Sequence, residues 1–170
     1  MSALGQSRPV AGRGHRVPAA AAGAGLSFLA ASAGVAAWHM AEGVPHGWWL
    51  ASFLGLVGGI AQLLLGAGHG ALAGSTPPIR AGSSRRHAVL WNAGTLLVPL
   101  GVLADARLAV VLGSALLIAA LGGSSLEVLA ARRARGGRTP RWQRAYVALL
   151  TCLGASVIVG TALAWDRPWV

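Results

Sequence analysis

Long apolar segments separated by short polar loops constrain the fold of this chain more than any other feature. Five such segments lie at about residues 18–38, 48–68, 88–104, 108–130 and 145–165. Each holds roughly 17–23 residues, and a helix of that length crosses a hydrocarbon core about 30 Å thick. Backbone groups in lipid must find partners within their own segment, so each segment is predicted to be a helix. The sequence therefore predicts an all-α integral membrane bundle of five transmembrane helices.

The charged residues support a membrane environment and argue against nucleic-acid binding. Only 11% of the 170 residues are charged, whereas soluble domains carry about 25%. All 14 basic residues are Arg, against 4 acidic residues, which gives a net charge of +10. The Arg residues gather in the loops, where contact with anionic lipid headgroups explains them. We expect the lipid bilayer, and not nucleic acid, to be the partner of these charges.

The distribution of Arg residues predicts how the chain is oriented. Twelve of the 14 lie in the N-terminal tail and in the second and fourth loops, and two lie on the opposite side. The positive-inside rule then places the N-terminus in the cytoplasm and the C-terminus outside, in a multi-pass protein of the plasma (inner) membrane. Residues 1–17 are predicted to be a disordered basic cytoplasmic tail, 18–166 the transmembrane bundle, and 167–170 an extracytoplasmic tail.

The first apolar segment has an alternative interpretation. Residues 1–37 resemble a secretory signal, because basic residues precede an apolar stretch that ends in the small residues Ala36 and Ala37. The stretch of about 20 residues is longer than the usual 7–15 of such signals, which favours a retained span. Cleavage would leave four spans with the same sidedness elsewhere.

The second segment has small and polar residues in helical register. On a regular helix they share an arc of about 100°: Gly55, Gly59, Gln62, Gly66, His69 and Gly70. One interpretation is a packing seam, because GxxxG spacing lets helices approach closely, and it would join a second copy or a membrane complex through Gly55, Gly59, Gly66 and Gly70. The other is a groove for a flat cofactor with His69 at its inner end.

Two histidines lie near the same membrane face on successive segments. His69 ends the second segment and His87 begins the third, and the two helices are expected to be antiparallel neighbours. Imidazoles ligate haem iron and copper, so we predict a cofactor site for haem b or copper at His69 and His87, with Gln62 and Asn92 beside it. Glu127, near the inner end of the fourth segment, is expected to pair with a nearby Arg or to reach the interface.

A second polar set lies in the first loop, on the outer side. His39, Glu42 and His46 are spaced by three and four residues, which places them on one face of a helix or on a helix end and turn. Two imidazoles and a carboxylate form a ligand set for zinc or copper. The alternative is that they are ordinary polar residues of an extracytoplasmic loop.

Three segments together resemble known membrane proteins: WHMAEGVPHGWW, GLVGGIAQLLLGAGHGAL and RRHAVLWNAGTLLVPLGVL. They are similar to small multi-span proteins related to the NnrS family and to the haem–copper oxidase catalytic subunit. The resemblance covers roughly residues 38–130 and implies that histidines at span ends bind haem or copper. The oxidase subunit has many more spans and ligands, and the single Tyr146 has no His in helical register, so the full oxidase mechanism is not expected.

Two functions therefore follow from the sequence. The first is a polytopic membrane protein that binds haem or copper through histidines at helix ends, as a redox or accessory component. The second is a non-enzymatic membrane assembly or transport subunit with no bound cofactor. The sequence has no phosphate-binding loop and no CxxC pair, so catalysis of the kind found in soluble enzymes is not expected.

Overall fold

The computed structural model of the chain describes residues 18–73, 81–134, 136 and 140–166. The predicted tails at 1–17 and 167–170 lie outside these residues. All the regular structure within the described residues is helical, as predicted. The elements are α1 (Ala19–Glu42), α2 (Gly47–Phe53), the π-helical segment η1 (Leu54–Ala61), α3 (Gln62–Ala73), α4 (Ala81–Leu103), α5 (Arg107–Ala134) and α6 (Arg141–Asp166).

Four helical stretches are long and apolar enough to cross a membrane. They are Ala19–Glu42, the continuous helix Gly47–Leu72, Arg107–Ala134 and Arg141–Val159. This agrees with the predicted membrane character of the chain. Helix α4 is not among the four: its first two turns carry Ser, Arg and His residues, and Pro99 lies inside it. The count of five spans and the orientation of the chain ends therefore stay predictions.

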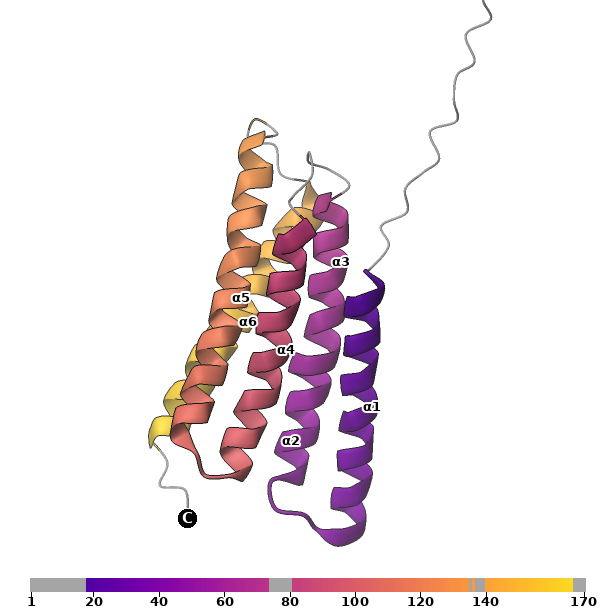
Figure 1. Cartoon of the computed structure of the whole chain (residues 1–170), viewed down its shortest axis with the longest axis vertical. Coiled ribbons are helices and arrows are strands. Elements are labelled where there is room, and N and C mark those ends of the chain that lie inside the picture. Colours follow the sequence, from indigo (N-terminus) through magenta and orange to yellow (C-terminus); the bar gives the residue numbers. More distant parts are fainter. Residues whose placement is uncertain (1–17, 74–80, 135, 137–139, 167–170) are drawn as a thin grey trace, which may run out of the picture.

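Neighbouring helices run antiparallel along the long axis of the bundle (Figure 1). Helix α1 lies at one edge against the continuous helix α2–η1–α3, and α4 lies between α3 and α5 in this view, with α6 behind (Figure 1). The end of α3, the start of α4 and the end of α5 consequently lie at the same end of the bundle. This arrangement determines which polar side chains can meet.

Helices α4 and α5 pack with their backbones nearly in contact, through glycines on both. A Cβ atom on Gly94 would lie 2.7 Å from the carbonyl oxygen of Gly113, and one on Gly113 would lie 2.9 Å from the backbone nitrogen of Val98. A Cβ on Gly101 would similarly lie 2.8 Å from the nitrogen of Val110. In lipid, where burial of apolar area does not drive helix association, such close backbone approach is a main source of packing energy.

The π-helical segment changes the register of the second helix partway along. Gly55 faces Ser32 of α1, and Gly59 faces Leu29 of the same helix, so a side chain at either glycine would collide with α1. The indole nitrogen of Trp91 in α4 donates a hydrogen bond of 3.2 Å to the carbonyl oxygen of Val57 within η1. The second helix packs on α1 along both of its halves, and it also contacts α4 through η1 and α5 through α3.

Candidate metal centre

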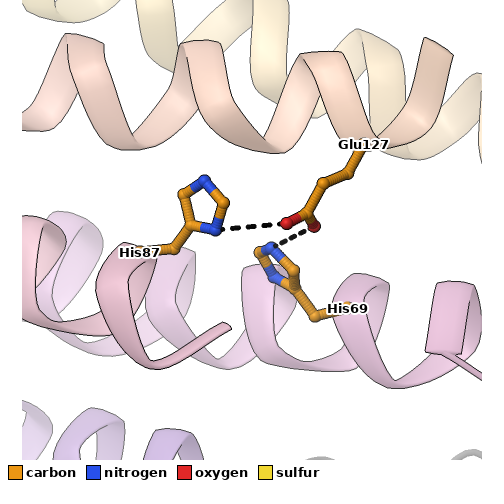
Figure 2. Close-up of side chains that lie close together, drawn as sticks. All are labelled: His69, His87 and Glu127. Atoms are coloured by element: carbon orange, nitrogen blue, oxygen red, sulfur yellow. Dashed lines mark ion pairs between the residues drawn. The ribbon is translucent and has the colours of Figure 1, made fainter. Parts of the chain in front are cut away.

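Three side chains from three helices converge at one end of the bundle: His69 of α3, His87 of α4 and Glu127 of α5 (Figure 2). One ligand atom from each lies within 4.8 Å of the others, and no other set of three such side chains meets this criterion among the described residues. His69 Nε2 lies 3.2 Å from Glu127 Oε2, and His87 Nδ1 lies 3.4 Å from Glu127 Oε1. The carboxylate therefore bridges the two imidazoles.

The cluster is largely buried, and a glycine makes room for it. The side chains of His69, His87 and Glu127 are only 12–14% exposed. Gly123 lies one turn before Glu127 on α5, and a Cβ atom there would collide with Nε2 of His87. A glycine at this position therefore allows the Nε2 edge of the His87 ring to approach α5, with Nδ1 toward the carboxylate.

A backbone hydrogen bond determines how His69 presents its second nitrogen. His69 Nδ1 lies 2.8 Å from the carbonyl oxygen of Leu65. A carbonyl oxygen can only accept, so Nδ1 carries a hydrogen and donates it. In the neutral imidazole this leaves a lone pair on Nε2, and that lone pair points at the Glu127 carboxylate. A ligating His in a metal site commonly has its other ring nitrogen fixed in this way.

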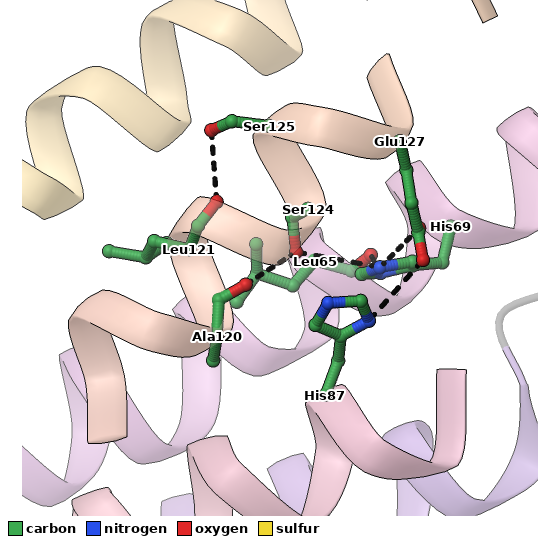
Figure 3. A network of polar contacts seen from close by, with 8 residues as sticks. All are labelled: Leu65, His69, His87, Ala120, Leu121, Ser124, Ser125 and Glu127. Carbon is green, nitrogen blue, oxygen red and sulfur yellow. Dashed lines mark hydrogen bonds and ion pairs between the residues drawn. The ribbon is translucent and has the colours of Figure 1, made fainter. Parts of the chain in front are cut away.

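A serine hydroxyl adds another oxygen to the same space (Figure 3). Ser124 Oγ lies 3.5 Å from His69 Nε2, and it donates its own hydrogen to the carbonyl oxygen of Ala120 at 3.1 Å. A neutral Nε2, the carboxylate and the serine oxygen all carry lone pairs, and such atoms repel one another at these distances. A positive charge between them, either a metal ion or a proton, removes that repulsion.

The donor set favours a single metal ion over haem. Two imidazoles and one carboxylate occur as ligands of zinc, copper and non-haem iron. A haem held by His69 and His87 would need its porphyrin between the two rings, where the Glu127 carboxylate lies. The neighbouring cavity measures about 40 Å³, which holds only about three water molecules at 10–15 Å³ each. The residues as arranged do not fit a porphyrin.

Of the four predicted cofactor residues, three lie together. His69, His87 and Gln62 line one cavity. Asn92 does not line it, because its amide donates a hydrogen bond of 2.7 Å to the carbonyl oxygen of Ala88, one turn back on its own helix. Glu127 was not predicted as part of the site. Its signal was present in the sequence, since it is the one acidic residue within an apolar segment and lies at the same depth as the two histidines.

The outer set of three residues does not form a comparable cluster. His39 Nδ1 donates a hydrogen bond of 2.8 Å to the carbonyl oxygen of Val44, and Glu42 accepts one of 2.8 Å from the indole of Trp38. His46 precedes α2 with a left-handed backbone, at φ 59°. His39 and Glu42 thus have local hydrogen bonds, and His46 lies in the turn before α2. The fold does not bring the ligand atoms of these three residues together. A metal site at His39, Glu42 and His46 stays a prediction without geometric support.

Comparisons with known proteins do not identify a relative of this chain. No family model matches it, and neither a curated protein nor a solved structure gives a match. The resemblance to NnrS-related and oxidase proteins therefore stays an expectation, and function has to be argued from the site itself.

Proposed function

We propose that the protein crosses the membrane five times, with the N-terminus in the cytoplasm and the metal centre near the cytoplasmic face. Helix α4 supports this count, because it lies among helices that are long enough to cross and runs antiparallel to α3 and α5 (Figure 1). The exposed Arg85, Arg86, Arg132 and Arg133 lie toward the same end as the centre. A reporter enzyme that works only outside the membrane should be active when fused after Val170 and inactive when fused before Met1. Activity at both ends would mean an even number of spans.

We further propose that the bundle binds one divalent transition-metal ion through His69 Nε2, His87 Nδ1 and the Glu127 carboxylate. The observation that carries this proposal is the convergence of their ligand atoms within 4.8 Å, from three different helices. Nitrogen and carboxylate donors follow the general order of affinities that places copper(II) and zinc at the top, so these ions are the first candidates. The protein would then be a membrane metalloprotein with a redox or accessory role.

A shared proton is the alternative occupant of the same site. Protonated His69 would donate from Nε2 to Glu127 at the observed 3.2 Å, which forms an ion pair without any metal. That outcome would suit the second function inferred from the sequence, an assembly or transport subunit without a cofactor. Metal analysis separates the two occupants directly.

The test is metal stoichiometry of the purified protein. Detergent-solubilised protein is stripped with a chelator, incubated with zinc or copper(II), freed of excess ion and measured by mass spectrometry of the elements. We expect about one ion per chain. His69→Ala should bind no stoichiometric ion, while His46→Asn should bind as the parent does, because Asn tolerates the left-handed backbone at that position. A parent protein that retains no ion would exclude the metal proposal.

Two adjacent glycines offer a matched test of the geometry. Gly123→Ala places a methyl group where His87 Nε2 now lies, so the ring must turn away from Glu127. We expect metal affinity to fall roughly 10–100-fold, as when a ligand loses its orientation. Gly122→Ala is the control, since a Cβ there meets nothing within 4 Å. Equal affinities in a competition titration of the two variants would contradict the proposed role of His87.

A further inference from the structure

A small cavity lies beside two of the three ligands, His69 and His87. It measures about 40 Å³ and is lined by His69, His87 and Ser124 as well as Gln62 of α3. Its remaining walls are mostly apolar and include Pro18, which precedes α1, and Ala21 of α1. The space is larger than the ion needs and accommodates about three water-sized molecules at 10–15 Å³ each.

Gln62 gives this cavity a specific polar feature. Its side chain is only 4% exposed, and no described residue forms a hydrogen bond with its Oε1 atom. A buried oxygen without a partner is costly, so it is usually satisfied by a bound molecule or serves a function. Gln62 is the first residue of α3 and directly follows the π-helical segment η1. Segments of this kind often occur at functional sites.

The number of protein ligands is consistent with a metal ion that keeps one coordination position open. Structural zinc sites use four protein ligands and leave no space, whereas catalytic sites use three and keep the fourth position for water or substrate. Here the described residues supply three ligands, and the cavity lined by His69 and His87 also exposes the acceptor Gln62 Oε1 on its wall.

We propose that this cavity holds an exchangeable ligand of the metal ion, namely a water molecule that donates a hydrogen bond to Gln62 Oε1 and can be displaced by a small anion. This inference rests on the proposed metal centre and extends it: the centre is of the open, exchangeable type and takes ligands of two or three atoms. Pro18 and Ala21, at the start of α1, line the same cavity.

Cobalt(II) and azide provide the test, because the visible spectrum of bound cobalt responds to a change of ligand. The full-length protein in detergent is loaded with cobalt(II) and titrated with azide. We expect the parent to bind one cobalt ion and to show a saturable spectral change. In Gln62→Leu the cobalt content should be unchanged and azide should bind roughly three- to tenfold more tightly, because the displaced water has lost its hydrogen bond.

A second pair of variants tests the cavity without changing any ligand. Ala21→Leu extends a side chain into the cavity from α1 and should weaken azide binding at least about tenfold. Ala20→Leu is the matched control, since its side chain is exposed on the same helix, and it should behave as the parent does.

The outcomes of these experiments distinguish failure of the exchangeable ligand from failure of the proposed metal centre. Failure of the parent to bind cobalt would overturn the metal centre and the exchangeable ligand together. A parent that binds cobalt but shows no azide response would overturn only the exchangeable ligand, as would unchanged azide affinity in both Gln62→Leu and Ala21→Leu.

Discussion

Replacing Glu127 with Gln is expected to abolish stoichiometric metal binding while leaving the bundle folded. The substitution keeps the size of the side chain and removes the negative charge that contacts both imidazoles, at 3.2 Å and 3.4 Å. The loss of an anionic ligand should exceed the 10–100-fold effect of disturbing a ligand's hydrogen-bond partner, so we expect affinity to fall more than about 100-fold. In the metal-free variant the new side-chain amide can donate to a histidine nitrogen, which supports folding without the ion.

Thermal unfolding with and without metal measures this effect. An ion present at 100 times its dissociation constant stabilises the parent by about 2.7 kcal/mol, so its unfolding temperature should rise on addition of metal. Glu127→Gln should show no such rise. Glu42→Gln is the matched control: it makes the same chemical change in the outer loop, where the amide oxygen can still accept from Trp38. A metal-dependent rise in Glu127→Gln equal to that of the parent would refute the ligand assignment.

Among the substitutions proposed for this protein, Gly113→Ala is expected to lower the free energy of unfolding the most. The added methyl group would lie 2.9 Å from the backbone nitrogen of Val98 and 3.2 Å from the carbonyl oxygen of Gly94, and backbone atoms cannot move aside as a side chain can. Helices α4 and α5 must separate instead. Overpacking of this kind typically costs about 1–3 kcal/mol, and we expect the upper part of that range because the contact is between backbones.

The same substitution should also weaken the metal centre, because α4 carries His87 and α5 carries Glu127. Unfolding in detergent, followed by circular dichroism, measures the loss of stability, and a metal titration of the same sample measures the second effect. Gly122→Ala on the same helix is again the control, because nothing lies near its Cβ position. If Gly113→Ala unfolds at the same temperature as this control, then close packing of α4 on α5 is not essential to the fold.

The helices were predictable from the sequence because lipid leaves the backbone few alternatives. Long apolar segments must satisfy their own hydrogen bonds, so their existence and approximate bounds follow from composition. The observed helices differ from the predicted segments at their ends. Helix α3 runs on to Ala73, beyond the predicted limit at 68, and helix α5 runs on to Ala134, beyond the predicted limit at 130. The basic residues Arg132 and Arg133 in the last turn of α5 stabilise that extension through the helix dipole.

The faces of the helices were much harder to predict. In a membrane the surface of a helix is as apolar as its packed side, so hydropathy does not show that Glu127 points inward. The register of the second helix was also hard to predict, because a helical wheel of 100° per residue assumes an uninterrupted α-helix, whereas segment η1 contains wider turns. Gly55 and Gly59 pack on α1, and Gly66 lines the cavity that Ala21 of α1 also lines. Whether any of these glycines also contacts a second chain stays a prediction.

The origin of the three ligands in three separate helices has a mechanical consequence. Sliding one helix past its neighbour by a single residue moves a ligand about 1.5 Å, whereas metal–ligand distances tolerate only about 0.2 Å. The affinity of the centre therefore depends on the axial alignment of α3, α4 and α5. An ion bound at the proposed centre would in turn resist shear between these helices, because it would link all three.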